Sequence, residues 1–327
     1  MKRIFSMALV LGLALSTLVG CSNGATADNK VVIYSSAEEY RNEYLQQRLK
    51  EQFPNYEITI EYMTSGNQAA KLLAEGGSTA CDISYDLEFG YVDKLRENLA
   101  DLSSYDSSIF LDELVDSQHQ VLPELRNGGC IAINPDVLAA KGLAEPTSYQ
   151  DLLKPEYKGL ISMPSPKSSG TGYMFLKALV NAWGEEEALA YFDQLSENIL
   201  QYTSSGSGPV NALVQGEAAI GLAMTAQTVT EINNGANLKI LFFEEGSPYS
   251  LYGMAMVKGK ETRPAVKEVF DFFYNTLVRE EKAKFFPEKI YKSEDYTVEH
   301  YPTDIRYADM SNNTADEKER LLAKWTH

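Results

Sequence analysis

Four short segments of the chain gather hydroxyl side chains, three of them together with glycine, and such groups can hold an anion. The segments are Ser35-Ser36, Thr64-Ser65-Gly66, Ser168-Ser169-Gly170-Thr171 and Ser204-Ser205-Gly206-Ser207. Serine and threonine hydroxyls donate hydrogen bonds, and glycine allows backbone amides to approach a ligand closely. These residue types favour the binding of a small anion without a cationic side chain.

The elements expected around these segments would bring them together. Each segment follows an apolar run typical of a β-strand and precedes residues with helical spacing. In an open α/β sheet, such loops lie where helix N-termini carry a partial positive charge and ligands bind. Helix capping is the alternative explanation, but "SGTG" (169–172) and "SGSG" (205–208) flank a hydroxyl with two glycines, which capping does not require. Together the four segments predict an anion-binding cleft.

Several enzyme signatures are absent from the sequence. The P-loop pattern, the dinucleotide-binding glycine pattern and the nucleophile elbow do not occur. The three histidines, His119, His300 and His327, lie away from any cysteine motif, and no paired-carboxylate motif accompanies the loops. We expect a binding protein without enzymatic activity, cofactor or metal, with a phosphate-handling enzyme on the same architecture as the alternative. A purely adhesive role would not explain the four loops.

The N-terminus predicts export and anchoring. Two basic residues precede an uncharged apolar run that ends at Gly20, which is typical of a secretory signal over residues 1–20. Cys21 follows directly and resembles the cysteine of a bacterial lipobox, with an ordinary signal and a chance cysteine as the alternative. We expect cleavage before Cys21, lipidation of Cys21 and a tether at 21–30. The protein would then stand at the extracellular face of the membrane, or in the periplasm of a Gram-negative cell.

Chain length and patterning predict an α/β fold with two lobes. Removal of residues 1–20 from the 327-residue chain leaves 307, which is too many for one compact core. We expect mixed, mostly parallel sheets, with lobe 1 over 31–133, lobe 2 over 134–250, and a return to lobe 1 with the C-terminal helices over 251–327. The expected strands lie near 31–36, 56–63, 81–88, 160–166, 199–205, 219–224 and 238–243, and two further stretches, 128–135 and 251–259, precede the second series of elements and the long helix near 263–286. The expected helices lie near 40–53, 67–77, 174–183, 187–195, 209–218, 263–286 and 315–325.

The net charge restricts the possible partners, and the cysteine content leaves the state of the thiols open. The formal charge of −17 becomes −19 without the basic residues of the signal, which argues against nucleic acid. Cys81 and Cys130 lie in apolar runs, and the sequence leaves a disulfide and two buried free thiols equally open. We expect a monomer.

Five longer stretches carry a resemblance to a known family. They are "YSS" (34–36), "SSGTGY" (168–173), "SSGSGPVNALVQGEAAIGLAM" (204–224), "EEGSPYSLYGMAMVKG" (244–259) and "YPTDIRYADM" (301–310). The chain resembles the type 2 periplasmic (extracellular) solute-binding proteins of ABC importers, in the branch shared by ferric-ion, phosphonate and sugar-phosphate binders. The resemblance implies two lobes joined by crossing strands, a ligand between them, closure on binding, and delivery to a permease and an ATPase.

The resemblance also bears on the ligand. Ferric-binding members hold iron with two consecutive tyrosines after the strand equivalent to "AIGLAM" (219–224). Here that place reads Met224-Thr225-Ala226-Gln227, and the chain contains no Tyr-Tyr pair. Ferric iron prefers anionic oxygen ligands, so the resemblance favours a phosphonate or an organophosphate such as a sugar phosphate, with Thr225 as a neutral donor. Binding of ferric ion is the alternative.

Four further side chains complete the predicted site. Glu88 and Glu245 would pair with an amine or hydroxyls of the ligand, or else be solvated surface carboxylates. Tyr34 and Tyr202 would pack on the carbon skeleton of the ligand, or else belong to strand packing. The predicted ligand-binding residues are Tyr34, Ser35, Ser36, Ser65, Gly66, Glu88, Ser168, Ser169, Gly170, Thr171, Tyr202, Ser205, Gly206, Ser207, Thr225 and Glu245.

Overall fold

The computed structural model describes residues 29–327 of the chain. The predicted signal peptide, the predicted lipidation site Cys21 and most of the predicted tether lie outside these residues. Within them, no helix has both the length and the apolar content that crossing a membrane requires.

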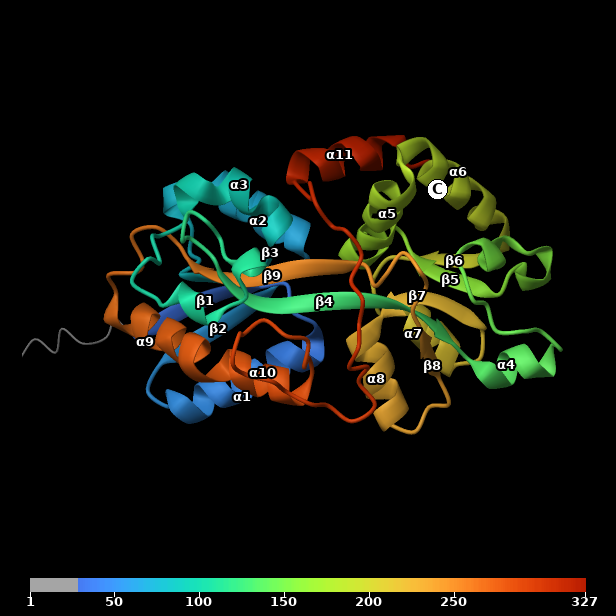
Figure 1. Cartoon of the computed structure of the whole chain (residues 1–327). Coiled ribbons are helices and arrows are strands. Elements are labelled where there is room, and N and C mark those ends of the chain that lie inside the picture. Colours follow the sequence, from blue (N-terminus) through green and yellow to red (C-terminus); the bar gives the residue numbers. More distant parts are fainter. Residues whose placement is uncertain (1–28) are drawn as a thin grey trace, which may run out of the picture.

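The strands form one mixed sheet that runs through two lobes (Figure 1). Its order is β2-β1-β3-β9-β4-β7-β5-β6, with β8 paired to β4. Lobe 1 contains β1–β3, β9 and the first half of β4, and lobe 2 contains β5–β8 and the second half of β4. The strands are β1 (Lys30–Ser35), β2 (Glu57–Tyr62), β3 (Ile83–Glu88), β4 (Leu122–Ile133), β5 (Ile161–Pro164), β6 (Ile199–Thr203), β7 (Ile220–Met224), β8 (Lys239–Leu241) and β9 (Tyr249–Met256). The predicted α/β fold class is confirmed, while the exact lobe boundaries stay a prediction.

The helices lie on both faces of this sheet. They are α1 (Glu39–Gln52), α2 (Ser65–Glu75), α3 (Val92–Leu95), α4 (Pro135–Ala140), α5 (Gly170–Trp183), α6 (Glu185–Leu195), α7 (Gly208–Val214), α8 (Thr225–Asn233), α9 (Pro264–Phe272), α10 (Val278–Lys284) and α11 (Ala315–Lys324). A π-helical turn at Phe273–Leu277 joins α9 to α10, so the long helix predicted near 263–286 is continuous but irregular. No pattern in the sequence predicted α8, whose threonines and valine are weak helix formers.

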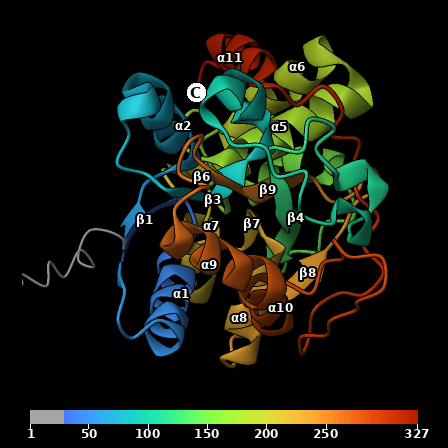
Figure 2. The ribbon, with the colours of Figure 1, turned by 90° about the vertical axis from the view of Figure 1, so that its left-hand side faces the viewer.

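Lobe 1 has a separate hydrophobic core on each face of its sheet. Seen from the lobe 1 end (Figure 2), α1, α9 and α10 lie on one side and α2 on the other. The first core joins Val31 and Leu45 to Val269 of the C-terminal half of the chain. The second core joins Leu72 of α2 to Leu87 of β3. Lobe 1 is therefore built from two segments that are far apart in the sequence.

Two segments cross between the lobes at a pair of glycines. β4 pairs with β9 up to Gly128 and with β7 from Gly129 onward. The backbone amide of Gly129 donates to the carbonyl of Pro248 at 2.7 Å, and the Ser247 hydroxyl donates to the carbonyl of Gly129 at 2.7 Å. A β-carbon on Gly129 would meet the Met174 side chain at 2.7 Å. Only glycine allows the two crossing segments and α5 to meet here.

The C-terminal helix α11 packs on lobe 2. Trp325 belongs to the lobe 2 core and contacts the ring of Phe192, with 5.2 Å between ring centroids. The predicted division assigned all of 251–327 to lobe 1, and β9, α9 and α10 do lie there (Figure 1). The apolar side chains Leu321 and Trp325 direct α11 to the other lobe.

Arg41 forms a buried charge cluster in lobe 1. Its side chain is 1% exposed, and its guanidinium nitrogens lie 2.7 Å from Asp86 and 2.9 Å from Glu281. It also contacts Glu124 of β4, and lies 3.5 Å from Glu38 at the start of α1. Burial raises the pKa of Glu124 well above its usual value, although Arg41 acts in the opposite direction. One cation thus connects α1, β3, β4 and α10.

Replacement of Arg41 with methionine should lower the free energy of unfolding by about 3–5 kcal/mol, because buried carboxylates would lose their cation. Without Arg41 the pKa of Glu124, which burial already raises, should rise further, so the native variant binds an extra proton and the difference in unfolding free energy from the wild type should narrow as pH falls. Denaturant unfolding at several pH values measures both effects.

Arg48→Met is the matched control on the same helix. Arg48 is 25% exposed and pairs with Glu280 at 2.8 Å, so its loss should cost less than about 1 kcal/mol. Equal losses for the two variants would contradict the role given to Arg41.

Candidate ligand-binding cleft

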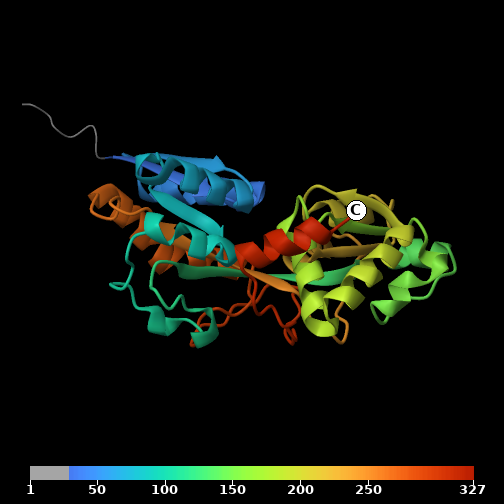
Figure 3. The ribbon, with the colours of Figure 1, turned by 90° about the horizontal axis from the view of Figure 1, so that it is seen from above.

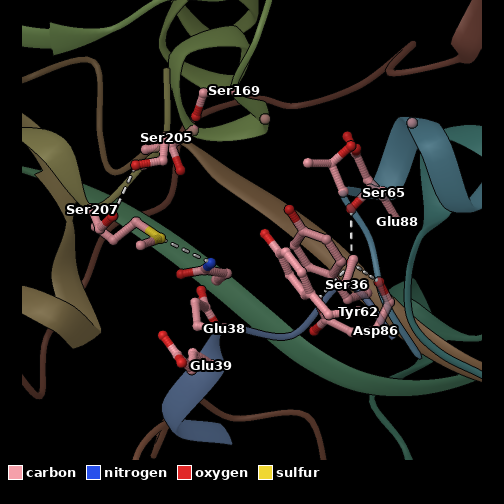
Figure 4. Close-up of a pocket in the computed structure, with 18 of the residues that line it drawn as sticks. Ser36, Glu38, Glu39, Tyr62, Ser65, Asp86, Glu88, Ser169, Ser205 and Ser207 are labelled. Carbon is pink, nitrogen blue, oxygen red and sulfur yellow. Dashed lines mark hydrogen bonds between the residues drawn. The ribbon is translucent and has the colours of Figure 1, made fainter. Parts of the chain in front are cut away.

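A cavity of about 1320 Å³ lies between the lobes and receives residues from both. Figure 3 shows the two lobes side by side from above, and the close-up shows side chains that line the cavity from both of them (Figure 4). Lobe 1 contributes the starts of α1 and α2 and the end of β3, while lobe 2 contributes the starts of α5, α7 and α8. The carboxyl ends of the strands in the two lobes face one another across the crossing segments, so the helix starts that follow these strands meet at the cavity.

Eleven of the predicted ligand-binding residues line this cavity. They are Ser36, Ser65, Gly66, Glu88, Ser168, Ser169, Gly170, Thr171, Ser205, Gly206 and Ser207. The other five do not line it, and each has a different environment.

Tyr34 and Ser35 are buried within lobe 1. The Tyr34 hydroxyl donates to Glu75 at 3.1 Å, and the ammonium of Lys71 lies 4.1 Å from the centre of its ring. The Ser35 hydroxyl donates to the side-chain oxygen of Asn42 at 2.8 Å, which ties β1 to α1. The two side chains point to opposite faces of the sheet, and neither lines the cavity.

Tyr202, Thr225 and Glu245 belong to lobe 2 but lie off the cavity. Tyr202 packs on the lobe 2 core and stacks on His327, and burial raises its pKa to about 12. Thr225 is fully buried at the first position of α8, where its hydroxyl has no hydrogen-bond partner among the described residues. Glu245 lies half-buried in the turn that precedes Ser247.

The start of α5 forms the centre of the lobe 2 wall. Its N-cap residue, Ser169, makes no side-chain capping hydrogen bond, and the first turn holds no acidic residue. The amides of this first turn therefore keep their hydrogen-bonding capacity and their partial positive charge. Lys167, which also lines the cavity, adds a cation to the same loop.

The second hydroxyl–glycine loop lies directly against the first. A β-carbon on Gly206 would meet the Thr171 hydroxyl oxygen at 2.3 Å, so the absence of a side chain lets the loops touch. The Ser205 and Ser207 hydroxyls lie 2.9 Å apart and share one hydrogen bond, which leaves one hydroxyl hydrogen free. The two loops together make a wall of hydrogen-bond donors.

Gly172 and Gly208, the second glycines of the two hydroxyl–glycine loops, have a role in packing rather than in ligand approach. A β-carbon on Gly172 would lie 2.3 Å from the carbonyl oxygen of Pro164, and one on Gly208 would lie 2.4 Å from Thr203. Both glycines are required where a helix start packs on the preceding strand. Gly170 and Gly206 remain at the cavity.

The lobe 1 serines present lone pairs rather than donors. The Ser36 hydroxyl donates to Asp86, whose carboxylate oxygen lies 2.8 Å away. Since Ser36 has one hydroxyl hydrogen, Ser65 must donate in the 2.9 Å contact between the two hydroxyls. Asp86 has a φ of +56°, and Arg41 holds its carboxylate in this strained position. The expectation that these serines donate to an anion is therefore not supported by their hydrogen bonds.

Acidic residues at the start of α1 also line the cavity, and no pattern in the sequence pointed to them. Glu38 and Glu39 extend from α1 toward the cleft (Figure 4), and Glu43 lies one turn further on. Burial raises the pKa of Glu38, with Arg41 lowering it and Asp86 raising it further. Glu231 of α8 lines the same cavity.

Lys318 of α11 reaches across the cleft to Glu88 of β3. Its ammonium lies 3.0 Å from the Glu88 carboxylate and 4.9 Å from the centre of the Tyr173 ring of lobe 2. Burial lowers the pKa of Lys318, but Glu88 and Tyr91 together raise it by more, so the pKa of Lys318 rises. Figure 3 shows α11 above the gap between the lobes. Glu88 thus already holds a cation of the protein itself.

Tyrosines line the rest of the lobe 1 wall and the floor. They are Tyr40, Tyr62, Tyr91 and Tyr252. Tyr62 is 63% exposed, which is unusual for a large aromatic side chain and suits contact with a bound molecule.

Metal and thiol chemistry find little support in the described residues. Among residues 29–327, no group of three or more His, Cys, Asp and Glu side chains is arranged to hold a metal ion. Cys81 and Cys130 are both free and buried, in the cores of different lobes. Burial raises the pKa of each thiol to about 12, which disfavours the reactive thiolate.

Comparison with known proteins relates this geometry to transport. Residues 88–306 match the family model described as bacterial extracellular solute-binding protein. The spermidine/putrescine-binding periplasmic protein of Escherichia coli is 23% identical over 267 residues, which cover 76% of this chain and 74% of that protein.

Solved structures of periplasmic binding proteins share the fold. The fructose-6-phosphate-bound AfuA from Actinobacillus pleuropneumoniae superposes with a TM-score of 0.78 at 24% identity, covering 90% of this chain and 97% of that chain. The iron-bound HitA from Pseudomonas aeruginosa superposes with a TM-score of 0.77 at 17% identity, covering 91% and 99%. Identities this low establish the fold alone.

Replacement of Lys318 with methionine should lower the free energy of unfolding by about 3 kcal/mol, because Glu88 would stay buried without its cation. The double variant Lys318→Met, Glu88→Gln should recover most of this loss, since no unpaired charge remains. Denaturant unfolding of the single and double variants gives the energies.

The exposed pair between Lys94 and Asp316, at 2.9 Å, provides the control. Lys94→Met should cost less than about 1 kcal/mol. A Lys318 variant as stable as the Lys94 variant would show that α11 does not hold the lobes in this way.

Proposed function

Because this chain belongs to the bacterial extracellular solute-binding protein family, we propose that it captures a small anionic solute for an ABC importer. The solute carries a phosphonate or phosphoryl group, as a sugar phosphate does, and binds in the cleft between the lobes. The lobes close on it, and the protein delivers it to the permease and ATPase subunits.

The uncapped start of α5 is the observation that carries this proposal. Among the described α-helices, α4 and α11 have a side-chain cap, from Asn134 and Thr314, and neither begins at the cavity. The helices α1, α2, α5, α7 and α8, whose first turns border the cavity, have none. Of these, α5 combines free amides with the hydroxyls of Ser169 and Thr171 and with Lys167. An oxyanion satisfies all of these donors at once.

Ferric ion is a weaker candidate for the same cleft. The position after β7 holds the buried Thr225 in place of a tyrosine, so phenolate ligands are missing there. The iron of HitA and the sugar phosphate bound by AfuA are ligands of those proteins, and at such identities they do not decide between the candidates.

A lipid anchor at Cys21 would keep the protein beside its permease. The resemblance to a lipobox supports this part of the proposal, and the tether at 21–30 would give the lobes freedom to move. The match to a family of extracellular solute-binding proteins supports holding a solute rather than enzymatic turnover.

Alanine at Ser169, Thr171, Ser205 or Ser207 should weaken phosphonate or sugar phosphate binding about tenfold to a hundredfold per site that donates. A hydrogen bond to a charged acceptor contributes roughly 1.5–3 kcal/mol, which sets this range. Titration calorimetry with methylphosphonate and fructose 6-phosphate measures the affinity, and thermal melts measure stability. Stability should change little, because none of these side chains caps a helix.

Asn134→Ala is the control for capping. Asn134 accepts hydrogen bonds from the amides of Asp136 and Val137, both at 3.1 Å, far from the cavity. Asn134 also donates to the carbonyl of Leu213 at 2.9 Å, so this variant should lose about 1–2 kcal/mol of stability and keep its affinity. Loop variants that lose stability while keeping full affinity would place the ligand site elsewhere.

Cys21→Ala should leave the precursor unprocessed or release the chain from the membrane, because the thiol that receives the lipid is gone. Membrane fractionation and mass spectrometry of the mature N-terminus test this. A normally processed, membrane-held Cys21→Ala protein would contradict lipidation at Cys21.

A further inference from the structure

Two parts of the cleft wall carry opposite charge. The start of α5 presents backbone amides, several hydroxyls and Lys167, whereas the start of α1 in lobe 1 and Glu231 of α8 in lobe 2 present carboxylates. The cavity is lined by six carboxylates and two lysines: Glu38, Glu39, Glu43, Asp86, Glu88 and Glu231, with Lys167 and Lys318. A ligand that fills the cleft meets both kinds of wall.

Part of the acidic charge has no partner in the protein. Asp86 is paired with Arg41, and Glu88 is paired with Lys318. Glu39, Glu43 and Glu231 form no ion pair with any residue that the structure describes, and Glu38 has only a 3.5 Å contact with Arg41. The overall charge of the chain, −17, adds to this negative potential.

The unpaired carboxylates gather at one end of the cleft. Tyr40 of α1 packs on a hydrophobic cluster that includes Val229 of α8, so both helices border this end of the cleft. Glu39 lies on α1 next to Tyr40, and Glu231 lies on α8 two residues after Val229. In Figure 4, Glu38 and Glu39 lie on the opposite side of the cleft from Ser169.

An unsatisfied acceptor on β4 gives a second, independent observation. Asn127 lines the cavity and is only 7% exposed. Its amide nitrogen donates to the sulfur of Met224 at 3.4 Å, and its side-chain oxygen has no hydrogen-bond partner among the described residues. Since the thioether sulfur only accepts, the oxygen is the atom left over. A buried carbonyl without a donor is costly, so it indicates a donor supplied by the ligand.

From these observations we propose that the solute carries a primary ammonium group in addition to its phosphonate or phosphoryl group. The ammonium donates to the Asn127 side-chain oxygen and is balanced by Glu38, Glu39 and Glu231, while the anionic group lies at the start of α5. This inference rests on the proposed function and narrows its substrate class to amino-substituted phosphonates or phosphate esters.

Neither simpler ligand class satisfies both walls. A plain anion would leave the carboxylates uncompensated and Asn127 without a donor. A diamine would place a positive charge against the helix N-terminus of α5, where the dipole repels it. A ligand with both charges is complementary to the whole cleft.

Matched probe pairs that differ only in the amine test the proposal. Suitable pairs are ethylphosphonate with 2-aminoethylphosphonate, and glucose 6-phosphate with glucosamine 6-phosphate; putrescine is the probe without an anion. In titration calorimetry of the full mature protein, at least one amino probe should bind about tenfold or more tightly than its partner, as expected for a charge-assisted hydrogen bond.

Substitutions of Glu38, Glu39 and Asn127 then test whether these residues cause the preference for the amino probe. Glu38→Gln and Glu39→Gln should each bring the ratio of the two affinities toward one, mainly by weakening the amino probe. Glu51→Gln, at the far end of α1 and outside the cavity, makes the same charge change and should leave the ratio as it is. Asn127→Leu, which removes the acceptor, should lower the ratio as well.

The outcomes separate this inference from the proposed function. Equal affinity for both members of every pair overturns the ammonium site and leaves anion binding intact. Failure of every phosphorylated or phosphonate probe, with tight binding of putrescine, overturns both. An amino preference that Glu38→Gln, Glu39→Gln and Asn127→Leu all leave unchanged overturns the assignment of the site.

Discussion

The buried guanidinium of Arg41 is the interaction on which the first lobe depends. It draws together carboxylates from α1, β3, β4 and α10, and so joins the N-terminal and C-terminal parts of the chain that build this lobe. Burying so many charges has a high desolvation cost, so the cluster contributes more to a unique geometry than to net stability. Its effect reaches the cleft, because Asp86 positions Ser36 and through it Ser65.

Periodicity along the chain predicted most of the fold. The alternation of apolar runs with helical spacing indicated nearly every strand and the longer helices, because each buries one clear face. β4 was marked only by an apolar run over its second half, since Leu122–Asn127 includes a proline and two charged residues. These residues are tolerated because they face Arg41 and the crossing strand, which are contacts between distant parts of the chain. α11 packs on lobe 2 for a similar long-range reason.

Mainly the hydroxyl–glycine loops of the candidate site could be predicted from the sequence. The hydroxyl–glycine loops are local motifs, so their convergence followed from the general position of loops in α/β sheets. The carboxylates of α1 and α8 and Asn127 of β4 have no shared motif, and only the tertiary fold brings them to one cavity. Arg41 did leave one signal: it occupies the buried stripe of α1 with Leu45 and Leu49, at spacings of four residues. Tyr34, Ser35 and Thr225 do not line the cavity, and sequence alone does not reveal which side of a strand or helix faces it.

The central claim is that the donor wall at the start of α5 holds a phosphonate or phosphoryl group. Native mass spectrometry of the protein purified from its own cells, without added ligand, tests this most directly. The account predicts a bound small organic molecule whose fragmentation yields phosphate or phosphonate ions. Recovery of a polyamine or a ferric ion, with no phosphorus in the bound species, would contradict it.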